Sequence, residues 1–194
     1  ARFVLHLWRT SLVSGPPLGT STPIVARLTR LIGDGALFYL VPGEAWTDAL
    51  NAFVGNSPAK AAWKALLIHA LSATGSRPPA KWLKSADKLI EDIGAKDIRA
   101  ALPAWLAVMP KGGSVRKPGG RDLLHEENAT CLRGLLWILP LLPDREGLAR
   151  VISAVGVSAY RKIPVVGARS MKVGNAAVYA LSELGSTDAV GQLA

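Results

Sequence analysis

The sequence predicts an all-α fold made of helix pairs that stack on one another. Apolar residues recur three and four positions apart along most of the chain, whereas no convincing series of alternating strand patterns occurs. The 194 residues include 19 glycines and 13 prolines, which divide these apolar stretches into short elements. A unit of helix, tight turn and helix also recurs along the chain.

Four helices are expected in the front half. The first is "PGEAWTDALNAFV", residues 42–54. The second is expected to start with Ser57 as N-cap and Pro58 at the first helical position, and to run to Gly75. The third follows the prolines of "RPPAKWLKSADKLIEDIG" and ends at Gly94, a residue suited to the position after a helix. The fourth, residues 96–109, contains Pro103, which predicts a break or kink.

Residues 110–122, "PKGGSVRKPGGRD", are the clearest predicted loop. Four glycines and two prolines disfavour regular structure there, and four basic residues keep the segment in water. The loop separates a front from a back segment of one helical domain, which we expect to span residues 1–194. We also expect the chain to be a fragment of a longer protein.

The sequence of the back half predicts repeated helix pairs. The helix expected at residues 169–185 is one member of such a pair. "YALSELG" at 179–185 matches "HALSATG" at 69–75, and a further copy between them is centred on Leu139. The first two copies are farther apart than the last two, so an extra helix or insertion is expected between them. The alignment predicts equivalent buried positions at Leu71, Leu139 and Leu181, and a position for flat side chains at His69, Trp137 and Tyr179. A repeat of about 40 residues is typical of HEAT or armadillo-like superhelices, in which stacked pairs jointly bury their apolar faces.

Three stretches resemble the N-terminal helical region of large bacterial proteins grouped as domain of unknown function 4132. They are "WKALLIHALSATGSRPPAKWLKSADKLIEDIG", "ENATCLRGLLWIL" and "RKIPVVGARSMKVGNAAVYALSELG", and the resemblance covers about residues 60–194. Some members carry a WGR-type domain, and some are labelled molybdate metabolism regulators. The resemblance implies a multi-helix, HEAT-like region without established catalytic residues. The segment 1–55 does not share it.

The chain is strongly basic, with a formal net charge of +9. Between residues 111 and 172, eleven Lys and Arg stand against five Asp and Glu, so the excess is concentrated in the second half. Such a surface attracts an anionic partner. The alternative is that an acidic remainder of the same protein covers it.

The predicted anion or nucleic-acid site consists of basic residues around "IPVVGA", a segment expected to be a loop between two helices. The first set is Arg161, Lys162, Arg169 and Lys172, of which the last two lie near a helix N-terminus that itself favours anions. The second set is Arg116, Lys117 and Arg121 in the glycine-rich loop. The alternative is an ordinary basic loop or a contact with the rest of the chain. The tryptophans, which could stack on bases, are expected in the core.

No catalytic residue, metal or cofactor is predicted. "HEEN" at 125–128 resembles a zinc-protease pattern, but Ala129 stands where the second histidine would be. Phosphate-loop and nucleophile-elbow patterns do not occur. The single cysteine, Cys131, excludes an internal disulfide and indicates a reducing, cytoplasmic setting, and no apolar run is long enough to predict a membrane span.

Three functional hypotheses remain at this stage. The first, which we favour, is a non-catalytic scaffold that binds a protein partner or the remainder of its own chain. The second is nucleic-acid binding through a basic surface, which includes a HEAT-like DNA glycosylase type of module. The third is a segment that only supports a catalytic domain elsewhere in the chain.

Overall fold

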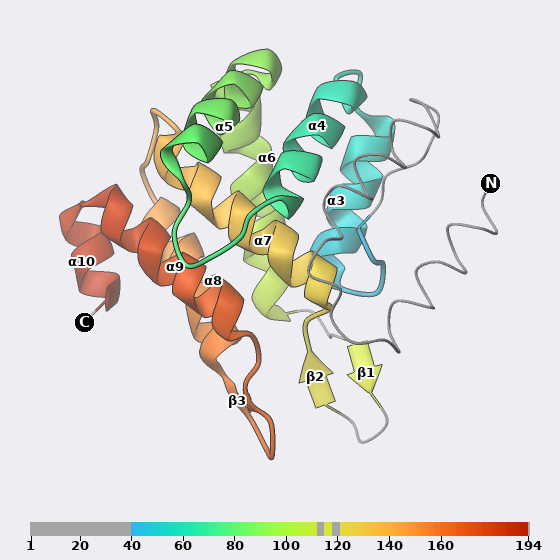
Figure 1. Cartoon of the computed structure of the whole chain (residues 1–194), viewed down its shortest axis with the longest axis vertical. Coiled ribbons are helices and arrows are strands. Elements are labelled where there is room, and N and C mark those ends of the chain that lie inside the picture. The colour runs from blue at the N-terminus through green and yellow to red at the C-terminus, as the bar shows by residue number, and fades with distance from the viewer. Residues whose placement is uncertain (1–39, 112–114, 118–120, 194) are drawn as a thin grey trace. The chain divides into compact units, whose positions relative to one another are not determined.

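A computed structural model describes residues 40–111, 115–117 and 121–193, which belong to the second of two compact units, residues 39–194 (Figure 1). The extent of the helical domain before residue 40 stays a prediction, because those residues lie outside the described ones. The α-helices are α3 (Ala45–Asn56), α4 (Lys60–Leu71), α5 (Ala80–Ile93), α6 (Ala95–Val108), α7 (Glu126–Ile138), α8 (Leu148–Tyr160), α9 (Met171–Leu184) and α10 (Thr187–Leu193). Two short 3-10 turns are η1 (Met109–Lys111) and η2 (Leu139–Leu141).

The predicted all-α class is confirmed. Helices pack directly on helices, and the strands of the described residues form only two small antiparallel hairpins. In the first, β1 (Val115–Lys117) pairs with β2 (Arg121–Leu123), and in the second, β3 (Lys162–Ile163) pairs with β4 (Gly167–Ala168). The expectation that residues 110–122 lack regular structure is therefore wrong. Its glycines fall before β1 and between the two strands in sequence, where hairpins favour glycine.

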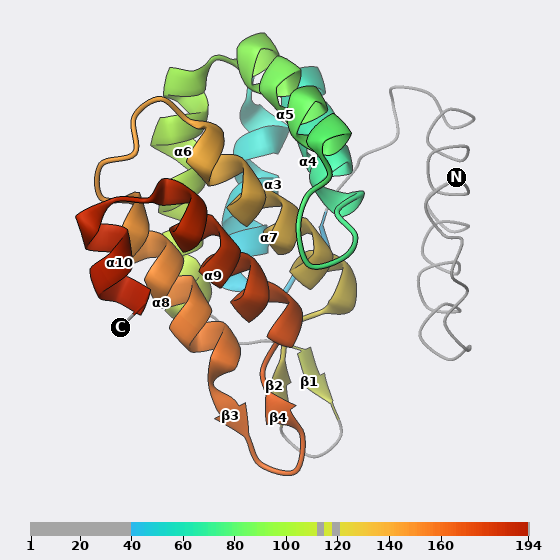
Figure 2. The same cartoon turned by 60° about the vertical axis from the view of Figure 1, so that its left-hand side comes forward.

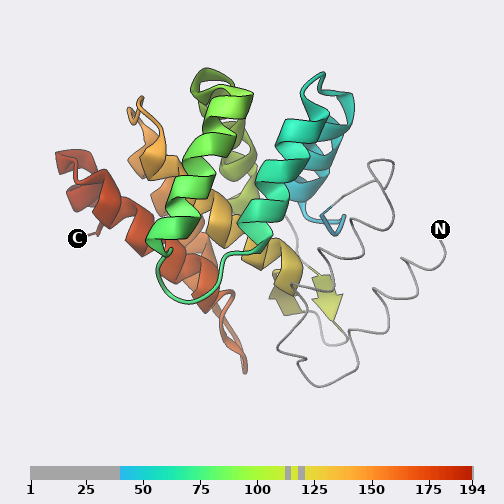
Figure 3. The ribbon, with the colours of Figure 1, turned by 45° about the horizontal axis from the view of Figure 1, so that its top comes forward.

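The helices form two neighbouring rows, as in helical-repeat folds. One row contains α4, α7 and α9, and the other contains α3, α6 and α8, while α10 packs on both α8 and α9 (Figures 1 and 2). The front helices depart from simple pair stacking, because α3 and α5 each contact both α4 and α6. Figure 3 shows α4 and α5 beside each other, joined by a loop.

Helix boundaries follow the predicted signals in α5 but not in α4. Helix α5 starts directly after Pro79 and ends before Gly94, whose φ is +100°. Helix α4 starts at Lys60 rather than at Pro58, because the Ser57 hydroxyl accepts a hydrogen bond from the Ala59 amide at 3.2 Å and holds a turn before the helix.

The predicted break at Pro103 does not occur. Helix α6 continues through it to Val108. The residues around the proline, Leu102, Trp105 and Leu106, are buried and hold the helix against its neighbours. Tertiary packing thus compensates for the hydrogen bond that the proline removes.

The positions aligned in the predicted repeat lie in different surroundings, and the repeat itself stays a prediction. Leu139 and Leu181 are buried, but Leu71 is only half-buried because it is the last residue of α4. The flat side chains, in contrast, lie in one line of ring contacts. His69 stacks on Trp82 with 4.3 Å between ring centroids, Trp82 meets Trp137 at 5.5 Å, and Trp137 meets Tyr179 at 6.2 Å. These contacts connect α4, α5, α7 and α9.

The tryptophans of the described residues are core residues, as predicted. Trp46, Trp63, Trp82, Trp105 and Trp137 are all buried. Helices α4 and α7 also cross unusually closely: a Cβ added at Gly134 would lie 2.4 Å from the Ala70 carbonyl oxygen. Glycine is therefore required at this crossing.

Candidate functional site: a basic hairpin beside the start of α9

The segment between α8 and α9 forms a closed hairpin rather than the expected open loop. The Arg169 amide donates to the Arg161 carbonyl at 3.0 Å, and the Ser170 amide donates to the Ala159 carbonyl at 2.9 Å. Ile163, the second residue of β3, is buried. The Ser170 hydroxyl accepts from the Val173 amide at 3.4 Å and caps α9. The hairpin is thus anchored at its base by both helices.

The tip of this hairpin contains an unfavourable backbone conformation. The Val166 amide donates to the Ile163 carbonyl at 3.1 Å, which places Pro164 and Val165 at the two central positions of a turn. Val165 has φ +67°. A proline followed by a positive φ is the pattern of a type II turn, whose second central position favours glycine or asparagine. The left-handed conformation costs about 1–2 kcal/mol for an ordinary L-residue, and a β-branched side chain is poorly suited to it.

Large apolar side chains are exposed at the hairpin and at the helix ends that hold it. In the described part of the chain nine large apolar residues are exposed, and five of them lie between residues 157 and 171. Val165 is 93% exposed, and the others are Val157, Tyr160, Val166 and Met171. Exposed apolar residues that gather in one place, unlike scattered ones, are typical of interaction surfaces.

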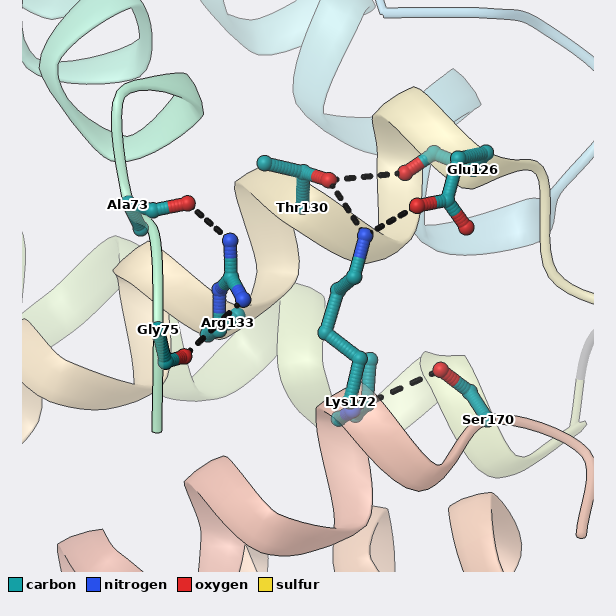
Figure 4. A network of polar contacts seen from close by, with 8 residues as sticks. Ala73, Gly75, Glu126, Thr130, Arg133, Ser170 and Lys172 are labelled. Atoms are coloured by element: carbon teal, nitrogen blue, oxygen red, sulfur yellow. Dashed lines mark hydrogen bonds and ion pairs between the residues drawn. The ribbon is translucent and has the colours of Figure 1, made fainter. Parts of the chain in front are cut away.

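The four cations predicted to converge on this segment do not point to one place. Arg161 and Lys162 are exposed on the hairpin. Arg169 is buried, and its Nη1 donates to the Ser158 hydroxyl at 2.8 Å, so this side chain stabilises the base of the hairpin. Lys172 turns away from it towards α7 (Figure 4). Anion binding by the whole set stays a prediction.

Lys172 joins the first turn of α9 to the first turn of α7. Its ammonium donates to the Glu126 carboxylate, with which it forms an ion pair, and to the Thr130 hydroxyl at 2.9 Å (Figure 4). Because β2 leads into α7 and β4 leads into α9, this contact brings the two hairpins to the same end of the described helices (Figure 2).

The second set of predicted cations lies on the β1–β2 hairpin. The strand register places Lys117 opposite Arg121 and Arg116 opposite Asp122. The structure therefore brings this set to the same end of the helices as Arg161 and Lys162, although the two sets are far apart in sequence.

The chain around the β3–β4 hairpin contains no acidic residue. Between Glu146 and Glu183 there is no Asp or Glu, and the cations in that interval are Arg150, Arg161, Lys162, Arg169 and Lys172. The sequence alone shows this stretch without acidic residues. The net charge counted over residues 111–172 does not reveal it, because that range includes five acidic residues. In space, Glu126 of α7 enters this region and pairs with Lys172.

A second polar contact of α7 fixes the loop between α4 and α5. The guanidinium of Arg133 donates to the carbonyls of Ala73 and, at 3.1 Å, of Gly75, and it lies 5.5 Å from the centre of the Trp137 ring (Figure 4). Helix α7 therefore carries one side chain that binds the front half of the described chain and two that bind α9.

Two side chains that could perform chemistry, Cys131 and His69, are engaged in packing and hydrogen bonding. Burial raises the pKa of the Cys131 thiol far above its ordinary value, which disfavours the nucleophilic thiolate. His69 is half-buried, and its Nε2 donates to the Trp82 carbonyl at 3.0 Å. Among the described residues no three His, Cys, Asp or Glu side chains gather as a metal site would require. None of the described helices is long and apolar enough to cross a membrane.

In comparisons with protein families, with curated proteins and with solved structures, nothing matches the chain. The resemblance to the helical region of the domain of unknown function 4132 proteins therefore stays a prediction. Function is inferred below from the geometry of the described residues.

Proposed function

We propose that this chain is a non-catalytic protein-interaction scaffold, in which the stacked helices hold the β3–β4 hairpin out as a contact element. The proposal rests mainly on the backbone conformation and the exposure of Val165. Its backbone is in the left-handed region while its side chain is 93% exposed, so the side chain gains little packing within the chain to offset that cost. Strained conformations of this kind concentrate where a segment is shaped for a partner.

The surroundings of the hairpin support the same proposal. Its base is fixed by backbone hydrogen bonds from both helices and by the buried Arg169, so the tip is presented on a rigid support. A pre-formed contact element lowers the entropy cost of binding. The proposal includes a cytoplasmic location, which the single, buried thiol of Cys131 supports.

The experiment is a comparison of complexes formed in cells. The chain is expressed with an affinity tag in three forms: unchanged, with Pro164–Val166 replaced by Asn-Gly, and with Lys88→Glu on α5 as a distant control. We expect one protein to be recovered in a fixed ratio with the unchanged form and the control but not with the hairpin variant. Recovery that is equal for all three forms would refute the proposal.

Nucleic-acid binding is the second candidate, and one observation favours it. The Lys172–Glu126 contact brings two basic hairpins to the same end of the helices. The test is a titration with short single- and double-stranded DNA at low and moderate salt. Phosphate contacts predict a steep loss of affinity with salt, because each contact releases condensed counterions. Absence of binding at low salt would remove this candidate.

A further inference from the structure

One face of α9, which follows the hairpin, also carries exposed apolar residues. The ring of Tyr160 lies over Gly174, where an added Cβ would come within 2.6 Å of it, and its hydroxyl donates to Asn175 at 2.7 Å. Met171, Asn175 and Val178 are all exposed. Their spacing of four and three residues places them on the same side of the helix.

We define the β3–β4 surface by exposed residues of the hairpin, of the end of α8 and of one side of α9. They are Arg161, Lys162, Val165, Val166, Tyr160, Met171 and Val178. Along α9 alone, Met171 and Val178 are seven residues apart, which corresponds to about 10 Å of helix. This length fits a short peptide segment.

The sequence segment that forms the surface carries charge of one sign. Residues 147–182 contain no Asp or Glu, and the acidic Glu126 that enters from α7 is already paired with Lys172. The cations on the hairpin itself are Arg161 and Lys162, and both are exposed. A complementary partner must therefore supply negative charge.

Apolar contact, rather than charge, dominates the rest of the surface. Arg169 and Lys172, which would strengthen a phosphate site, are used within the chain by Ser158, Glu126 and Thr130. A nucleic-acid backbone would leave Val165, Met171 and Val178 without apolar partners. A peptide that combines acidic with apolar side chains satisfies both parts of the surface.

Resting on the proposed scaffold function, we infer that the β3–β4 surface binds a short protein segment in which Asp or Glu side chains flank large apolar ones. The apolar side chains of that segment cover Val165, Met171 and Val178, and its carboxylates meet Lys162. Val165 is the central anchor, because it lies at the tip of the turn and is the most exposed of the apolar residues.

The test is selection of peptides from a random 12-residue display library on the whole 194-residue chain. We expect the selected peptides to combine Asp or Glu with Leu, Ile, Phe or Trp. One of them, synthesised with a fluorophore, is then titrated with four variants of the chain. Val165→Asn combined with Met171→Gln removes apolar surface, and Lys162→Glu reverses charge. Val190→Asn and Lys88→Glu make matched changes at exposed sites on α10 and α5.

We expect the first variant to weaken peptide binding by about tenfold or more, as loss of an interface anchor does. Lys162→Glu weakens it by about threefold or more, while the two controls stay within about twofold. Asparagine tolerates the left-handed region, so the hairpin keeps its shape, and an unchanged circular dichroism spectrum checks this for each variant.

Three results would overturn the inference. Selected peptides that depend on the hairpin but lack acidic residues refute the partner chemistry and leave the scaffold function standing. No selection, or binding that all four variants leave unchanged, refutes the surface, whereas the scaffold function is decided separately by the complexes recovered from cells. Short DNA that displaces the peptide and binds more tightly than it would assign the surface to nucleic acid.

Discussion

The left-handed backbone conformation of Val165 does not suit its β-branched side chain, and the strain should lower the free energy of unfolding. The residue has φ +67° and is almost fully exposed. Asparagine tolerates this conformation, so Val165→Asn is expected to raise the free energy of unfolding by about 1 kcal/mol in urea denaturation. The same change at the neighbouring Val166, whose φ is not positive, should give no gain. Equal effects at both positions would show that the turn is not strained.

Gly134 is the residue at which a single methyl group has the largest predicted effect on packing. An added Cβ would lie 2.4–2.8 Å from the backbone of Ala70, which can yield only if α4 and α7 move apart. Gly134→Ala is therefore expected to lower the free energy of unfolding by about 3 kcal/mol. The control is Gly191→Ala on α10, where the added methyl group meets open space and improves helix propensity. A tolerated Gly134→Ala would contradict the close crossing of these helices.

His69 makes stability depend on pH in a defined direction. Burial lowers its pKa below the ordinary value of 6.5, although the hydrogen bond to the Trp82 carbonyl opposes this. Between the lowered pKa and 6.5 the unfolded chain binds more protons than the folded one, so stability is lost as pH falls below 6.5. The difference in stability between the parent and His69→Gln should therefore shrink on acidification in that range. A difference that widens would contradict the neutral, stacked imidazole.

At the scale of elements, Arg133 determines whether the loop between α4 and α5 stays on α7. Its guanidinium bonds two carbonyls at once, and a lysine ammonium cannot reproduce that fork. Arg133→Lys is expected to cost about 1 kcal/mol of stability and to speed amide hydrogen exchange at residues 72–77. Lys84→Arg on the exposed side of α5 is the control. Unchanged exchange in the loop would show that Arg133 does not hold it.

Element boundaries are predictable where local signals act alone. Pro79 and Gly94 bound α5 because a proline suits a helix start and a glycine suits a positive φ, and both effects are local. Pro103 predicts a break that does not form, since packing of buried neighbours keeps α6 intact. The hairpins are not predicted because strands of two or three residues are too short to produce an alternating pattern.

The candidate site is only partly predictable. The sequence identifies the basic segment around residues 161–172, and the structure keeps Arg161 and Lys162 on its surface. The sequence does not predict that Arg169 turns inward or that Lys172 pairs with Glu126, which lies far away along the chain. Such contacts depend on how α7 and α9 pack. The apolar tip also gives no signal in the sequence, because exposure of Val165 follows from the turn and not from its residue type.

At the scale of the whole described molecule, one row of helices holds the three flat side chains that the repeat alignment superposes. His69, Trp137 and Tyr179 lie on α4, α7 and α9, the three helices of one row, and their rings form a line of contacts through Trp82. That these positions are equivalent members of a repeat stays a prediction. Two helices, α5 and α6, lie between α4 and α7, whereas only α8 lies between α7 and α9, and this accounts for the wider spacing between the first two copies.

The central claim, that the β3–β4 hairpin is the contact element of a scaffold, is tested most directly by photo-crosslinking in cells. A photoreactive phenylalanine is placed at position 165, and in separate chains at position 190 on α10 and position 87 on α5, all exposed. We predict a discrete crosslinked protein from position 165, which is reduced when Lys162→Glu is added, and none from the other two positions. Crosslinks that are absent at 165, or equally abundant at all three positions, would contradict the claim.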